Sequence, residues 1–139
     1  MSEQDREAAV RRWLEAWNTH DLNASQSLLE PGFVRHDANL PEVNGPHEQR
    51  SFLAGVFQAF PDIRVEPQQL ISQGDLVAVR LTVQGTHWDE FLGVPATGRQ
   101  IMIQSVDIFR VTNDKIAEQW VLMDALGLMQ QLGAIPSAT

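Results

Sequence analysis

The sequence contains no cysteine and no tyrosine, and acidic residues far outnumber basic ones. The absence of cysteine excludes disulfide bonds, thiolate metal sites and a thiol nucleophile. The absence of tyrosine excludes any mechanism in which a phenol donates a hydrogen bond to a developing oxyanion. Ten Lys and Arg against eighteen Asp and Glu give a net charge of −8, which repels phosphate backbones and anionic membranes. We therefore expect neither nucleic acid nor a membrane as a partner.

Long apolar runs are also missing. No stretch approaches the roughly 20 apolar residues that a membrane-spanning helix needs. The first residues, MSEQDREAAV, are charged from the third position and lack the apolar segment of a signal peptide. We therefore expect a cytoplasmic location. A length of 139 residues, of which 43% are apolar and 20% charged, predicts one globular domain over residues 1–139.

The N-terminal part of the chain has helical periodicity. Ser2 and Asp5 resemble a helix N-cap, and apolar residues then recur at helical spacing, which predicts a helix that ends at residue 18 or 19. A short second helix is expected over 23–29, stopped by the turn signal at 30–32, and residues 33–36 are expected to be extended. Residues 37–46 are rich in Asn, Pro and Gly and predict a loop, and a third helix is expected from Pro46 to Phe60.

The rest of the chain alternates as strands do. Strands are predicted over 63–72, 76–87, 99–111 and 115–124, with an irregular excursion over 88–98 and a helical turn over 125–133 that ends at Gly133. Helices followed by antiparallel strands predict an α+β fold, in which a curved, cone-shaped antiparallel sheet wraps around the N-terminal helices. The open end of such a cone leaves an apolar cavity, which is a typical small-molecule site.

Asp107 is the first catalytic candidate. Strand alternation places it on one face with Ile103, Ser105 and Phe109, and a carboxylate among apolar neighbours acts as a general acid or base if its pKa is raised. The alternative is a surface ion pair with Arg80 or Arg110.

Three further catalytic candidates each have a structural alternative. Gln119 either donates a hydrogen bond to a substrate carbonyl or pairs across strands. His36 either shuttles protons at the pocket mouth or is an exposed loop residue. Asp124 either belongs to the site or caps the closing turn.

Cofactor motifs are missing from the sequence. It has no pair of His at metal-ligand spacing, no Gly-rich phosphate loop and no nucleophile elbow, so we expect neither a metal nor another cofactor. The aromatic side chains either line a pocket or form plain core; they are Trp13, Trp17, Phe52, Phe57, Phe60, Trp88, Phe91 and Trp120. The residues we expect to bind a substrate are Trp17, Phe33, Phe57, Arg80, Ile103, Gln104, Ser105 and Val121.

Three segments carry a resemblance to a known family: EAWNTHDL, GTHWDEFLGVPATGR and IFRVTNDKIAEQWVLMDALGLMQQLG. With them the chain resembles, over nearly its whole length, the SnoaL-like polyketide cyclases and ester cyclases of the nuclear-transport-factor-2-like superfamily. The resemblance implies a cone-shaped α+β barrel, a homodimer or homotetramer, and cofactor-free aldol ring closure of an aromatic polyketide ester. An acidic residue in these cyclases removes a proton next to a carbonyl.

The chain departs from the pattern of that family in the last strand. Where the usual pattern is E-H-W-D, this sequence has Glu118, Gln119, Trp120 and Val121, so that both the His and the catalytic Asp are replaced. Asp107 stands where cyclases can carry a pocket His. Either the catalytic carboxylate has moved to the neighbouring strand, at Asp107, or the acid–base function has been lost.

Three functions therefore stay open. The first is a cofactor-free cyclase, isomerase or lyase in which Asp107 is the base and Gln119, with Gln104 or His36, holds the enolate oxygen. The second resembles the epoxide hydrolases of the same superfamily and uses Asp107, Arg80 and Asp124. The third is a non-catalytic domain that binds an apolar ligand. In each case we expect a small apolar or aromatic molecule, polyketide-like or terpenoid-like.

Overall fold

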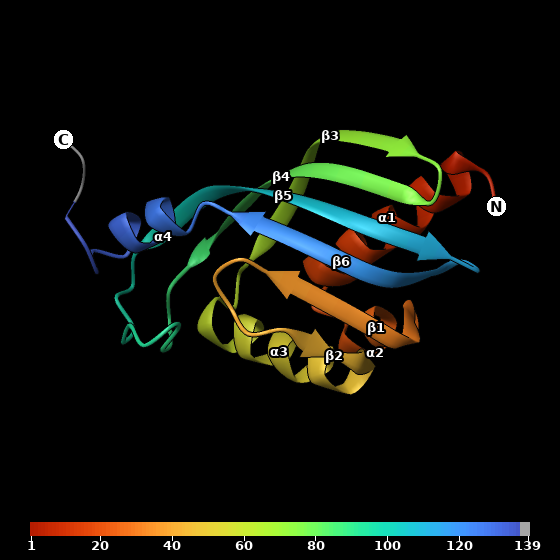
Figure 1. Cartoon of the computed structure of the whole chain (residues 1–139). Helices are drawn as coiled ribbons and strands as arrows, with labels where there is room; N and C mark the ends of the chain where they lie inside the picture. The colour runs from red at the N-terminus through yellow and green to blue at the C-terminus, as the bar shows by residue number, and fades with distance from the viewer. Residues whose placement is uncertain (137–139) are drawn as a thin grey trace.

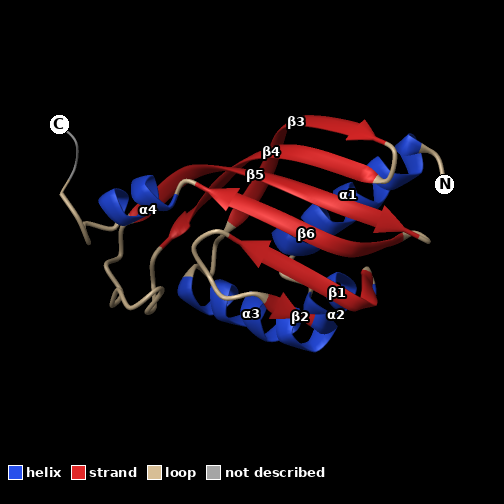
Figure 2. Ribbon diagram, in the orientation of Figure 1, coloured by secondary structure: helices blue, strands red, loops and turns tan. Residues whose placement is uncertain are grey.

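The computed structural model describes residues 1–136 as an α+β fold, which confirms the predicted fold class. Six strands form one curved sheet, against which the N-terminal helices pack (Figures 1 and 2). The elements in chain order are α1 (Glu3–Asn18), α2 (Leu22–Ser27), β1 (Leu29–Asp37), β2 (Val43–Asn44), α3 (Gly45–Ala59), β3 (Arg64–Gln73), β4 (Leu76–Thr86), β5 (Gln100–Thr112), β6 (Lys115–Met123) and α4 (Ala125–Gln131). No helix among the described residues is long and apolar enough to cross a membrane.

Helix α1 has the predicted bounds. The Ser2 hydroxyl accepts a hydrogen bond from the Asp5 backbone, and the Asp5 carboxylate accepts one from the Ser2 backbone, which together form a capping box. The predicted apolar face is buried against the sheet. At the other end the Asn18 side chain both donates to and accepts from the backbone of Val65, which fixes α1 to β3.

The second helix and the segment after it differ from the prediction. Helix α2 ends at Ser27, and the expected turn at 30–32 lies inside β1, where a register shift between Leu29 and Val34 accommodates Pro31 and Gly32. Strand β1 continues through Asp37 because it pairs in parallel with β6, far away in sequence. The expected loop over 37–46 therefore contains the end of β1 and the short β2.

The sheet has the order β2-β1-β6-β5-β4-β3 and is antiparallel except between β1 and β6. Strands β3 to β6 agree with the four predicted strands to within a residue or two. Burial along β5 alternates as predicted, with odd-numbered residues facing the helices. In β6 a register shift leaves Ala117 unpaired, so that Ile116 and Gln119 are both buried, although strict alternation would put them on opposite faces of the sheet.

Helix α4 packs against β5 at one end of the sheet (Figure 1). Helix α4 ends before Gly133, whose positive φ of 76° closes the helix as predicted. The excursion over 88–98 is irregular, with a single bridge between Phe91 and Val94. These two segments and the N-terminal helices surround the space described next.

Candidate active site

A cavity lies between the inner face of the sheet and helices α1 and α3. Its volume, counted as the space that the centre of a water molecule can reach, is about 80 Å³, several times the roughly 10–15 Å³ that one water needs. Aromatic and aliphatic side chains make most of its wall, among them Trp13, Trp17, Phe52, Phe60 and Phe91. The wall also contains four polar residues, all from the sheet: Arg35, Ser105, Asp107 and Gln119.

The Asp107 carboxylate accepts two side-chain hydrogen bonds at the wall of this cavity. Only 4% of the residue is exposed, and its carboxylate accepts hydrogen bonds from the Ser105 hydroxyl at 2.6 Å and from the Gln119 amide at 3.0 Å. Burial raises the pKa of the Asp107 carboxyl group to about 6, against the opposing effect of these hydrogen bonds and of the nearby Arg35 charge. A carboxyl group with this pKa exchanges protons readily near neutral pH.

An ion pair on β1 completes the polar cluster, and the sequence analysis missed it. The Arg35 guanidinium lies 3.2 Å from the Asp37 carboxylate and 4.4 Å above the Phe52 ring, and both charged side chains are almost fully buried. The Asn39 backbone donates to the other Asp37 oxygen at 2.8 Å. Burial lowers the pKa of the Arg35 guanidinium, while the charges of Asp37 and Asp107 oppose this shift. The alternation of Phe33, Arg35 and Asp37 was the signal that could have revealed one inward face.

Strand register explains why these groups meet. Asp37 pairs with Val121 of β6, which in turn pairs with Asp107 of β5, so the three residues form one row across three strands. The next row is Arg35, Gln119 and Phe109. Val121 therefore separates two carboxylates whose Cα atoms are roughly 10 Å apart, or two strand spacings.

Of the predicted substrate-binding residues, Trp17, Ile103, Ser105 and Val121 line the cavity. Phe33 is buried in the core and Phe57 stacks on His20, and neither reaches the cavity wall. Arg80 and Gln104 are exposed on the outer face, because each alternates with buried neighbours along its strand. These four residues therefore lie outside this cavity.

Two predicted catalytic residues also lie elsewhere. His36 lies between Arg35 and Asp37 on β1, and its side chain points to the opposite face of the sheet. Its imidazole contacts the Glu118 carboxylate at 2.6 Å and stacks on Trp120. Asp124 caps α4 by accepting from the Gly127 backbone at 2.9 Å, which was its structural alternative. Neither lines the cavity.

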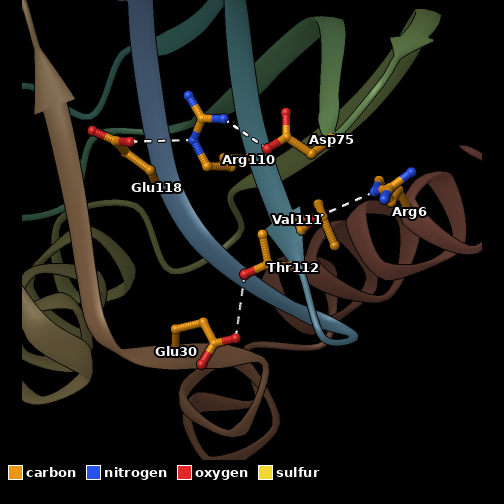
Figure 3. A network of polar contacts seen from close by, with 7 residues as sticks. All are labelled: Arg6, Glu30, Asp75, Arg110, Val111, Thr112 and Glu118. Atoms are coloured by element: carbon orange, nitrogen blue, oxygen red, sulfur yellow. Dashed lines mark hydrogen bonds and ion pairs between the residues drawn. The ribbon is translucent and has the colours of Figure 1, made fainter. Parts of the chain in front are cut away.

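The surface ion pair offered as the alternative for Asp107 is not formed. Arg110 contacts Asp75 at 2.7 Å and Glu118 at 3.6 Å on the outer face of the sheet (Figure 3). Among the residues that the structure describes, no ion pair joins Arg80 to Asp107. The carboxylate therefore belongs to the cavity and not to the surface.

Comparison with known proteins agrees with this architecture. The profile of SnoaL-like polyketide cyclases matches residues 7–132. The chain belongs to this family. It is 29% identical to the aklanonic acid methyl ester cyclase DnrD of Streptomyces peucetius, over 89% of this chain and 88% of the relative. It is also 29% identical to the cyclase AcmA of Streptomyces galilaeus, over 96% and 92%.

Solved structures give the same result. The putative hydroxylase AclR of Streptomyces galilaeus superposes with a TM-score of 0.89 at 30% identity, covering 99% of this chain and 87% of AclR. A putative SnoaL-like polyketide cyclase from Jannaschia superposes with a TM-score of 0.88 at 26% identity, covering 96% and 95%. The family match and the curated cyclases support a polyketide cyclase-like enzyme, and these neighbours have the same fold.

Proposed function

We propose that the cavity is the active site of a cofactor-free enzyme that performs acid–base chemistry next to a carbonyl group, with Asp107 as the base. One observation carries the proposal: a buried carboxylate, held by Ser105 and Gln119, has its pKa raised to about 6 inside an apolar cavity. Curated relatives that are named aklanonic acid methyl ester cyclases support a polyketide-like ester as the substrate.

The proposed reaction is an intramolecular aldol ring closure. Asp107 takes a proton from a carbon next to a carbonyl and becomes neutral, while the substrate becomes an enolate. The enolate carbon then forms a bond to a second carbonyl carbon, and the resulting alkoxide takes the proton back from Asp107. The net charge of the cavity stays constant throughout, so no charge has to be brought in from water.

Each neighbour has a definite task in this scheme. Ser105 and Gln119 hold the carboxylate in one orientation, and a hydrogen bond from Gln119 to the carboxylate leaves its own carbonyl oxygen free of a protein partner. The positive charge of Arg35 is close to both Asp37 and Asp107, which limits the net charge of the cluster to −1 when Asp107 is ionised. Val121 keeps a third carboxylate out of the row.

The experiment is turnover of aklanonic acid methyl ester by the wild-type protein and by Asp107→Asn. We expect the variant to lose a factor of about 10²–10⁴ in kcat, the usual contribution of a general base. Asp75→Asn on the outer face is the matched control and keeps full activity. If Asp107→Asn cyclises the ester as fast as the wild type, Asp107 is not the base.

A second candidate, water addition to an epoxide, is favoured by the grouping of Asp37, Arg35 and Asp107. Arg80 and Asp124 lie outside the cavity, but Arg35 lines it and forms an ion pair with Asp37, which lies behind the cavity wall, so that these two supply the same residue types. One carboxylate would take a proton from the attacking water, and a protonated carboxyl group would give one to the epoxide oxygen. Diol formation from cyclohexene oxide that is lost in both Asp37→Asn and Asp107→Asn would favour this reaction.

The side chains of Asp107 and Arg35 count against the non-catalytic alternative, because they bring ionisable groups to the cavity. Val121, in place of the usual catalytic Asp, is the feature that favours that alternative. A wild-type protein that turns over neither the ester nor the epoxide, yet binds aromatic ligands, would restore it.

A further inference from the structure

Asp37 is a buried carboxylate that the proposed aldol chemistry does not use. Its side chain has 0% exposed surface, and the side chain of Arg35, its ion-pair partner at 3.2 Å, has 7%. Asp37 lies behind the part of the cavity wall that Arg35 forms. A buried ion pair is weak evidence for stability, because an apolar pair of similar size is often as stable or more stable. Stability alone therefore does not account for a carboxylate at this position.

The Arg35 guanidinium is held from two sides. One of its nitrogens contacts the Asp37 carboxylate, and its central carbon lies 4.4 Å from the centre of the Phe52 ring on α3. The Asn39 backbone donates to the other Asp37 oxygen at 2.8 Å, which fixes the carboxylate itself. These contacts keep the positive charge on the β1 side of the cavity.

Arg35 is nevertheless close to Asp107. It pairs with Gln119 across β1 and β6, and the Gln119 amide donates to Asp107 at 3.0 Å. Burial is the main cause of the raised pKa of Asp107; the Arg35 charge opposes this shift, and the Asp37 charge adds to it. Among the described residues no ion pair joins Arg35 to Asp107, and Nε and Nη1 of Arg35 donate to no protein group. The guanidinium therefore has donors left for a second carboxylate.

An ion pair between Arg35 and Asp107 would change the base. An opposite charge within about 4–6 Å lowers the pKa of a carboxyl group by roughly 1–3 units, and a carboxylate with a lower pKa is a weaker base. In the described part of the chain the other elements bring no charged side chain to the cavity wall. Their contributions are apolar or aromatic: Trp13 and Trp17 from α1, Phe52 and Val56 from α3, Phe91 from the excursion and Leu128 from α4.

We propose that Asp37 is a positioning residue, which together with the Phe52 ring holds the Arg35 guanidinium on β1 and thereby prevents an ion pair between Arg35 and Asp107. This inference rests on the proposed function, in which Asp107 is the base, and adds to it the residue that regulates the strength of that base. Arg35 stabilises the negative charge of Asp107 from a distance and leaves the carboxylate free to take a proton.

The test is the titration of Asp107, followed by the ¹³C NMR signal of its carboxyl carbon, which the Asp107→Asn protein identifies by its absence. In the wild type we expect half-ionisation at pH of about 6. Asp37→Asn keeps the size of the side chain and removes its charge, which frees Arg35 to bind Asp107. Half-ionisation should then move down by about 1–3 pH units, and the pH profile of kcat should move in the same direction. Asp75→Asn on the outer face is the control and moves neither. An unchanged titration in Asp37→Asn overturns the proposal.

A double variant distinguishes positioning from general damage to the site. Arg35→Met combined with Asp37→Leu removes both charges of the ion pair, so that no cation remains to bind Asp107. Half-ionisation of Asp107 should then stay at or above its wild-type pH, because burial still raises the pKa. A fall in the double variant as large as in Asp37→Asn would also overturn the proposal, since Arg35 could not be its cause.

Phe52→Leu provides a second test, which decides the matter if Asp37→Asn does not fold. The change removes the ring beside the Arg35 guanidinium and leaves every charge in place, and half-ionisation of Asp107 should move down by a smaller amount. Phe60→Leu is the matched control, because Phe60 lines the same cavity but its ring packs on His87. Equal titrations in these two variants contradict the holding of Arg35.

The titration does not depend on turnover. If Asp107→Asn keeps full turnover, the base assignment fails, while the titration still reports whether Asp37 holds Arg35. If the titration does not move in Asp37→Asn, the positioning role fails and the base assignment stands.

Discussion

Replacing Asp107 by Asn should stabilise the folded protein at neutral pH while it removes activity. The pKa of the Asp107 carboxyl group rises from 3.8 to about 6 on folding, so the folded state binds a proton more tightly than the unfolded state. The free energy of unfolding therefore falls as the pH rises through 3.8 towards 6, and the cost of the buried charge is fully present above 6. A difference of about two pH units at ~1.4 kcal/mol each makes this cost roughly 3 kcal/mol at pH 7.

Asparagine avoids that cost and keeps the hydrogen bonds. Its amide oxygen accepts from Ser105, and its amide nitrogen donates to the Gln119 oxygen, which has no partner in the wild-type protein, after the Gln119 amide turns over. Enzymes commonly lose some stability at a residue whose charge is needed for activity.

The assay is urea unfolding of both proteins from pH 4 to 7.5, followed by circular dichroism. Every other titrating group is shared, so the difference between the two free energies of unfolding isolates Asp107. We expect this difference to move in favour of Asp107→Asn by about 2 kcal/mol between pH 4 and pH 7, because part of the cost is already present at pH 4. A difference that stays constant with pH would show that Asp107 titrates normally and would refute the reasoning.

Three other variants test neighbouring parts of the molecule. Val121→Asp puts a third carboxylate between Asp37 and Asp107; we expect a loss of about 2–4 kcal/mol at pH 7 that recovers at pH 5, measured by urea midpoints, and equal losses at both pH values would contradict it. Asp124→Ala removes the N-cap of α4 and should cost about 1 kcal/mol in thermal unfolding with kcat unchanged, whereas a loss of kcat would return Asp124 to the site. Leu122 is 65% exposed on the outer sheet face; if that face forms the predicted homodimer or homotetramer, Leu122→Arg should yield a smaller species by light scattering, and an unchanged mass would place the interface elsewhere.

Local sequence patterns determined most of the framework and one catalytic candidate. The helical period of α1 and the strict alternation of β5 are properties of neighbouring residues, so they were readable without tertiary structure. The alternation of β5 placed Asp107 on the same face as Ser105 but left open whether that carboxylate lies in a cavity or in a surface ion pair. The capping roles of Ser2 and Asp124 were readable for the same reason, because a cap contacts backbone three residues away.

Long-range pairing decided the rest of the site. Strand β1 joins β6 across more than 80 residues, and this pairing turns Arg35 and Asp37 inward and His36 outward. A one-residue shift in the register of β1 against β6 reverses which of its side chains reach the cavity. The irregular β6 likewise moved Ile116 to the core.

The ionisation of the site also depends on the tertiary structure. The pKa of Asp107 is raised by burial beneath helices whose packing no local pattern specifies, and it is moderated by Arg35, which arrives from a different strand. The sequence by itself therefore determined most of the elements and the face of β5 that carries Asp107. Only the assembled sheet and helices decided which charges and donors surround it, because those contacts join residues that lie far apart in the chain.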